Sequence, residues 1–127
     1  TFALRHDPGY WSIDDVSVVP YGGGPEQLLN TGFETGDLSY WTYCNPKNAT
    51  DSGTVLYSST TSAYYPYYAH NGYYFYQDGS IGYEDYLSQT FLTTPKMEYY
   101  ISFYLANSGT GGSTIPFYND AFVYMSS

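Results

Sequence analysis

Residues that could perform acid–base or nucleophilic chemistry are few in this chain and poorly spaced for it. The only histidines are His6 and His70, and neither lies at a spacing typical of metal ligands. Two acidic pairs, Asp14–Asp15 and Glu84–Asp85, are adjacent residues, whose side chains diverge on a strand. A glycosidase needs two carboxyl groups that face each other across a cleft at about 5 to 9 Å. We therefore expect no catalytic residues and no enzymatic activity.

Tyrosine is the most abundant side chain that could contact a ligand, with 19 copies in 127 residues. Two dense stretches contain Tyr64, Tyr65, Tyr67, Tyr68, Tyr73, Tyr74 and Tyr76. An aromatic ring packs well against the apolar face of a sugar, and tyrosine is also favoured where protein subunits meet. Adjacent rings on a strand point to opposite faces, so at most half of each stretch can line one surface. We expect these tyrosines to contact polysaccharide or a neighbouring subunit.

One short motif suggests a covalent modification. Asn48-Ala49-Thr50 is an acceptor sequence for an N-linked glycan, in a loop context between Pro46 and Asp51-Ser52-Gly53. Such a motif fits the surface of a secreted protein. We therefore expect a glycan on Asn48 and an extracellular or cell-surface location.

The composition limits the class of protein. With 3 basic and 12 acidic residues the net charge is −9, so the chain is not suited to neutralise nucleic-acid phosphates. No run approaches the roughly 20 apolar residues of a membrane span, and no opening stretch has the pattern of a signal peptide. Charged residues make up 12% of the chain and aromatic residues 22%, which predicts a folded, tyrosine-faced domain. The single cysteine, Cys44, excludes an intrachain disulfide, and we expect it to be a small buried side chain.

Apolar and polar residues alternate with period two along most of the chain, which predicts an all-β fold. The clearest strand spans 99–106, and its predicted inward face carries Tyr99, Ile101, Phe103 and Leu105. Further short strands are predicted at 1–5, 73–76, 86–91 and 122–125. The apolar parity switches at Asp14–Asp15, which predicts a β-bulge. Short strands separated by glycine- and proline-rich turns are typical of a β-sandwich or jelly roll.

Two fragments of the chain form distinctive motifs: residues 30–41 read NTGFETGDLSYW, and residues 7–18 read DPGYWSIDDVSV. They resemble strands of jelly-roll carbohydrate-binding modules of the family four and nine type. In that family the N-x-G-F-E stretch begins the domain, and a W-x-[IL]-D-D-V-S-V stretch ends it. Here the order of the two motifs is inverted. The resemblance implies a jelly-roll fold and contact with carbohydrate.

The same resemblance implies a structural calcium ion between the first and last strands. Carried over to this chain, its ligands are Glu34 and Asp14 or Asp15, together with nearby backbone carbonyls. Calcium takes several oxygen ligands at about 2.3 to 2.6 Å. The alternative is that these carboxylates are solvated or hydrogen-bonded to the backbone.

The inverted order divides the chain into three parts. These are a closing segment at 1–20, a glycine-rich linker at 21–27 and a jelly-roll body at 28–127. Either the domain is circularly permuted and the closing segment completes its own body, or the segment completes a neighbouring subunit by donor-strand exchange. A third alternative is a slice through a tandem array. Residues 19–27 can extend to about 30 Å, which is long enough to bridge two subunits.

These features predict a structural subunit of an extracellular, glycosylated filament, in which strand exchange joins jelly-roll domains head to tail. A contact that repeats without closing produces a filament, so the main partner of the chain is a further copy of itself. The motif order, the tyrosines and the glycan acceptor also resemble the subunits of glycosylated fibrils found in freshwater microbial samples. The alternative is a carbohydrate-binding module that presents its tyrosines to polysaccharide.

Overall fold

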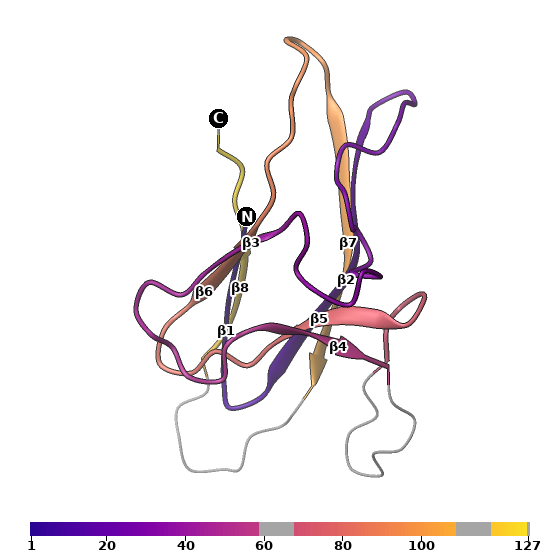
Figure 1. Cartoon of the computed structure of the whole chain (residues 1–127). Coiled ribbons are helices and arrows are strands. Elements are labelled where there is room, and N and C mark those ends of the chain that lie inside the picture. The colour runs from indigo at the N-terminus through magenta and orange to yellow at the C-terminus, as the bar shows by residue number, and fades with distance from the viewer. Residues whose placement is uncertain (59–67, 109–117, 127) are drawn as a thin grey trace.

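The chain folds into two packed antiparallel sheets (Figure 1). The computed structural model describes residues 1–58, 68–108 and 118–126. The strands of this part are β1 (Phe2–Asp7), β2 (Tyr10–Pro20), β3 (Thr42–Cys44), β4 (Thr54–Tyr57), β5 (Tyr74–Asp78), β6 (Asp85–Ser88), β7 (Tyr99–Ser108) and β8 (Tyr118–Val123). The first sheet has the order β3-β6-β1-β8, and the second has the order β4-β5-β2-β7. The predicted all-β sandwich is confirmed, and its arrangement is compatible with a jelly-roll-like fold.

No element of the described residues is a helix, so none of them could cross a membrane as a long apolar helix.

The closing segment supplies a central strand to each sheet. Strand β1 lies between β6 and β8, and β2 lies between β5 and β7. The chain passes from one sheet to the other through Pro8 and Gly9, which has a φ of 143°. A Cβ atom at Gly9 would lie 2.2 Å from the His6 ring, so this turn requires glycine. Residues 1–20 therefore belong to both layers of the sandwich.

Strand β2 contains the predicted β-bulge. Its register with β7 shifts between Asp14 and Ser17, and Asp15 has a φ of 47°. Before the bulge, β2 also pairs with β5. After the bulge, residues that follow the linker lie beside β2 instead of β5. The Val16 amide there donates to the Thr31 carbonyl at 3.0 Å. The bulge thus explains how apolar residues of both parities on β2 are buried.

The core is dominated by rings and branched aliphatic side chains from both sheets. Phe33 stacks on Trp41 at a centroid distance of 5.4 Å and on Tyr76 at 5.8 Å. The buried cluster consists of Phe2, Leu4, Ile13, Val16, Val18, Leu28, Phe33, Trp41, Tyr76 and Leu87. Tyrosine therefore fills part of the interior in a chain that is poor in aliphatic residues.

Three details differ from the sequence-based expectations. On β7, Ile101 and Phe103 pack on the core as predicted, but Leu105 is exposed, because β7 is the edge strand of its sheet. Cys44 is exposed and free rather than buried, since it ends the short edge strand β3. The edge strands β3 and β4 themselves were not predicted from the alternation, because three or four residues carry too little periodicity.

Candidate functional site

The fold brings the two sequence motifs together at the bulge of β2. A Cβ atom on Gly32 would lie 3.3 Å from Asp15 Oδ1, 3.5 Å from Asp14 Oδ1 and 3.7 Å from Glu34 Cγ. The hydrogen bond between Val16 and Thr31 holds the second motif against the bulge. Residues from 14–15 and 30–34 are thus neighbours although nearly 20 positions separate them.

The two aspartates at the bulge bind the loop that precedes β5. Asp14 Oδ2 accepts hydrogen bonds from the backbone amides of His70 at 2.7 Å and Asn71 at 3.2 Å. Asp15 Oδ2 lies 2.7 Å from His70 Nδ1. Burial raises the pKa of Asp14, although the backbone donors act in the opposite direction. This pair therefore anchors a loop by direct contact.

Glu34 binds the next residues of the same loop. Its Oε1 atom accepts hydrogen bonds from the amides of Tyr73 at 2.8 Å and Tyr74 at 3.0 Å. Gly72 allows this approach, because a Cβ atom there would lie 2.2 Å from Glu34 Oε1. All three carboxylates of the predicted calcium site therefore contact residues 70–74.

The hydrogen-bonded alternative describes this arrangement, and the calcium site stays a prediction. In the part of the chain that the structure describes, no group of three or more His, Cys, Asp or Glu side chains is placed to hold a metal ion. Asp14 and Asp15 nevertheless place carboxylate oxygens close to Gly32, while the Glu34 oxygens lie at Gly72, and oxygen is the ligand that calcium prefers.

Changing Glu34 to glutamine tests this calcium prediction. Glutamine keeps an acceptor for the amides of Tyr73 and Tyr74 but loses the charge that attracts a cation. If calcium binds, the variant's Tm should fall by about 4 °C or more in calcium, roughly 1 kcal/mol for a domain of this size. It should change little in excess chelator. Asp51→Asn, at an exposed aspartate, is the control. An equal fall in the Tm of Glu34→Gln in calcium and in chelator would show that Glu34 does not bind calcium.

The predicted tyrosines have different environments. Tyr64, Tyr65 and Tyr67 lie outside the described residues. Tyr68 and Tyr73 are exposed, and Tyr74 is half-buried. Tyr76 is fully buried, and its hydroxyl donates to Asp78 inside the sandwich. Tyr76 is therefore a core residue with no surface to offer a ligand or a subunit.

An exposed aromatic pair lies at one edge of the second sheet. The rings of Tyr57 and Tyr73 are parallel, with an interplanar angle of 1° and a centroid distance of 6.0 Å. Their exposed fractions are 58% and 63%, and Tyr74 meets Tyr57 edge to face. Sequence analysis missed Tyr57, whose only signal is its place at the end of the β4 alternation.

The predicted glycan acceptor is accessible. Asn48 is exposed in the loop that follows β3. The side chain of Asn45 braces this loop, since it donates to the Ala49 carbonyl at 2.9 Å and accepts from the Ala49 amide at 2.7 Å. Nothing in the loop covers the Asn48 side chain, as a glycan attachment site requires.

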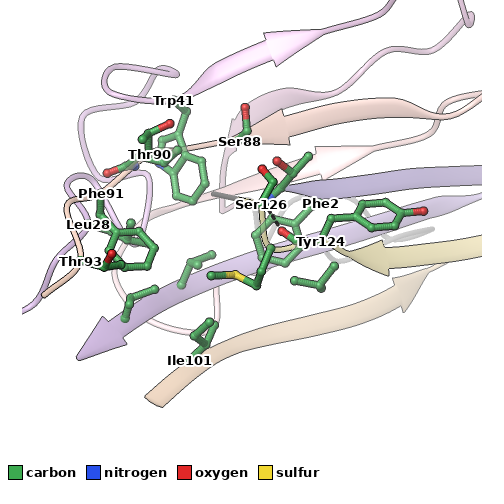
Figure 2. Close-up of a pocket in the computed structure, with 16 residues that line it drawn as sticks. Phe2, Leu28, Trp41, Ser88, Thr90, Phe91, Thr93, Ile101, Tyr124 and Ser126 are labelled. Carbon is green, nitrogen blue, oxygen red and sulfur yellow. Dashed lines mark hydrogen bonds between the residues drawn. The ribbon is translucent and has the colours of Figure 1, made fainter. Parts of the chain in front are cut away.

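An apolar cleft opens between the two sheets near the linker, and sequence analysis did not anticipate it (Figure 2). Its volume is about 680 Å³. The closing segment lines it with Phe2, Val16 and Val18, while the body contributes Trp41 and Ile101 among others. The cleft is therefore a boundary along which the closing segment meets the body.

The linker leaves β2 and returns to it. Residues 21–26 are exposed, and Gly22 and Gly23 have positive φ values of 91° and 109°. At its end, Glu26 accepts from the Ser17 hydroxyl at 2.6 Å and from the Val18 amide at 2.8 Å. Burial raises the pKa of Glu26, but its hydrogen bonds outweigh this and lower the pKa overall. The ionised Glu26 carboxylate thus closes an exposed loop onto β2.

Comparison with protein-family models, with curated proteins and with solved structures finds no match for this chain.

Proposed function

We propose that this chain is a structural subunit of an extracellular filament, in which the closing segment of one copy completes the sandwich of the next. The observation that carries this proposal is the position of residues 1–20. They supply one of the two inner strands of each sheet and continue into a linker whose residues 21–26 are exposed. Exposed Asn48 carries a covalent glycan in this proposal.

Exchange between copies conserves almost every contact of the closing segment. Strand β1 pairs with β6 and β8, and β2 pairs with β5 and β7, whichever copy supplies the two strands. Only the contacts of the linker, such as those of Glu26, differ between the two arrangements. A body without these strands would expose unpaired edges in both sheets, and a donated strand satisfies them. Each copy both donates and accepts, so the assembly grows into a filament when the rotation between neighbouring copies does not close it into a dimer or ring.

Strand β7 offers a surface for contacts between neighbouring copies. It is a ten-residue edge strand without charged residues or proline, whereas natural edges are usually short or charged. Tyr100 and Tyr104 on this strand are exposed. Long uncharged edges promote association, which suits a protein that polymerises.

Engineered disulfides distinguish exchange from an intact single-chain sandwich. Ser12 on β2 lies directly opposite Ala106 on β7. Directly opposed residues of antiparallel strands have Cα atoms about 4.5 to 5.5 Å apart, which suits a disulfide. With Cys44→Ser as background, Ser12→Cys with Ala106→Cys should link neighbouring copies in assembled material. A non-reducing denaturing gel should then show a ladder of covalent oligomers.

A matched pair within the body is the control. Thr42 on β3 lies opposite Ser88 on β6, and both belong to residues 28–127. Cysteines at these two positions should join only residues of one chain, with or without exchange. The contrary result is that regular filaments of the Ser12→Cys, Ala106→Cys variant also give only monomers on the non-reducing denaturing gel, like the control. In that case strand exchange is wrong, and the filament must form through other surfaces.

The second candidate function is a carbohydrate-binding module, and the parallel pair of Tyr57 and Tyr73 favours it. Two exposed rings at 6.0 Å present an aromatic surface of the kind on which sugars stack. Such a module works as a single sandwich with its closing segment in the same chain. A cross-linked monomer that is retained by insoluble polysaccharide would favour this function over the filament.

A further inference from the structure

Two carboxyl groups are fully buried where the chain crosses from the second sheet to the first. Asp78 ends β5, Asp85 begins β6, and both have an exposed fraction of 0%. Residues 79–84 connect them and form the crossing. The two side chains, called here the carboxyl pair, meet at Gly53: a Cβ atom there would lie 2.7 Å from Asp78 Oδ2, and the Gly53 amide donates to Asp85 Oδ2 at 3.2 Å.

The donors that the described residues offer to the carboxyl pair are neutral hydroxyl and amide groups. Asp85 Oδ2 accepts from the Tyr43 hydroxyl at 2.7 Å and from the Gly53 amide at 3.2 Å. Asp78 Oδ2 accepts from the Tyr76 hydroxyl at 3.1 Å, and Asp78 Oδ1 accepts from the Ser80 amide at 2.8 Å. These contacts account for three of the four carboxyl oxygens.

The fourth oxygen, Asp85 Oδ1, is buried and has no hydrogen-bond partner among the described residues. The Ser80 hydroxyl beside Asp78 is likewise buried without a partner. An unsatisfied buried carboxylate oxygen is costly, because it has lost its water and gained nothing in return. The missing contact to Asp85 Oδ1 therefore requires a donor or a cation.

In the described part of the chain, no basic side chain forms a hydrogen bond or an ion pair with the carboxyl pair. Tyr43 on β3 and Tyr76 on β5 are its titratable neighbours. Leu4 on β1 lies opposite Asp85, and Trp11 on β2 lies opposite Asp78.

Nearby charged and basic groups have other contacts or are exposed. His6 on β1 approaches through its backbone, where its amide donates to the Ser80 carbonyl, and its ring Nε2 contacts Asn107. The guanidinium of Arg5 binds Asp7 on the same strand. In the loop before β4, Asp51 is exposed. Two ionised carboxylates would therefore repel each other in a buried site without a compensating cation.

We propose that Asp78 and Asp85 share one proton, which Asp78 donates to the unpartnered Oδ1 of Asp85. The proton removes one of the two buried charges and satisfies the remaining oxygen at the same time. It also forms a hydrogen bond between β5 of one sheet and β6 of the other. The shared proton thus joins the two sheets and makes the stability of the sandwich depend on pH, whether or not the chain forms filaments.

The electrostatics of the site agree with this assignment. Burial raises the pKa of Asp78 from 3.8 to about 8, and the neighbouring Asp85 carboxyl acts in the same direction. Burial and the contact with Asp85 raise the pKa of Tyr43 to about 12, and burial and the nearby Asp78 raise the pKa of Tyr76. Both tyrosine hydroxyls therefore remain donors over the range in which the pair titrates.

The sign of the pH dependence follows from linkage. In the unfolded chain Asp78 loses its proton near pH 4, whereas in the folded protein it keeps the proton until about pH 8. Between these values the folded state holds one more proton than the unfolded state. The contribution of the pair to stability is complete below pH 4, declines as the pH rises to about 8, and is constant above that.

The variant Asp78→Asn tests the shared proton. The amide of asparagine can donate to Asp85 Oδ1 without any proton from solvent. We expect the Tm of the variant, minus that of the unchanged protein, to rise by about 10 °C between pH 5 and pH 8 in excess chelator. The exposed Asp51→Asn is the matched control and should follow the unchanged protein at every pH.

Carboxyl carbon NMR of the unchanged protein tests the same proposal without a substitution. The carboxyl group of Asp78 should titrate near pH 8. Titration of Asp78 near pH 4, or a parallel Tm profile for Asp78→Asn, would overturn the shared proton. Calcium at pH 9 is the last measurement: if it raises the Tm of the unchanged protein but not of Asp78→Asn, the pair holds a cation instead.

Discussion

Removing residues 1–20 is expected to leave a chain that neither folds into the sandwich nor assembles. The deletion removes an inner strand from each sheet, so the strands on both sides of it lose their hydrogen-bonding partner. It also removes half of the buried cluster, since five of its ten residues are Phe2, Leu4, Ile13, Val16 and Val18.

Adding the missing segment as a synthetic peptide should restore the fold. The peptide can pair with β5, β6, β7 and β8 in the registers that the intact chain uses. Circular dichroism and light scattering would report a folded complex that does not polymerise, because its donor is no longer covalently attached. A peptide with Ile13→Asp is the control and should not restore the fold, since Ile13 has no exposed surface. Filaments formed by the truncated chain alone would refute strand exchange.

The second large effect is expected for Trp41→Ala, which should lower the free energy of unfolding by about 3 to 5 kcal/mol. Trp41 stacks on Phe33, and its ring N–H donates to the Asn30 carbonyl at 3.0 Å. It also forms part of the wall of the apolar cleft, so its loss enlarges a space that already exists. The surrounding chain has little opportunity to collapse into it.

Denaturant unfolding of Trp41→Ala beside Tyr40→Ala would measure this effect. The two aromatic residues are adjacent, but Trp41 is 9% exposed and Tyr40 is 64% exposed. Tyr40→Ala should change stability by no more than about 0.5 kcal/mol. Trp11→Ala should fall between them, because Trp11 is only partly buried. A Trp41→Ala loss as small as that of Tyr40→Ala would show that the ring does not hold the core together.

The carboxylates of the candidate site were predictable, because each belongs to a distinctive fragment of the sequence. Asp14, Asp15 and Glu34 were singled out from two fragments, and the fold places all three around Gly32. Their hydrogen bonds to residues 70–74 were not predictable, because no pattern in the sequence links that loop to the bulge. Sequence analysis also placed Tyr76 among the tyrosines expected to contact polysaccharide or a subunit, although the Tyr76 ring stacks on Phe33 in the core.

The amino-acid sequence by itself determined the all-β class, the bulge at Asp14–Asp15 and the acidic net charge of −9. Those properties follow from alternation and charge, which are local or additive along the chain. Only the tertiary structure decided that Asp78 and Asp85 are buried together and that residues 1–20 are central to both sheets. Burial depends on partners that are distant in sequence, such as Tyr43, which lies 42 positions from Asp85. No local pattern records such a partner, because it is chosen when the two sheets pack.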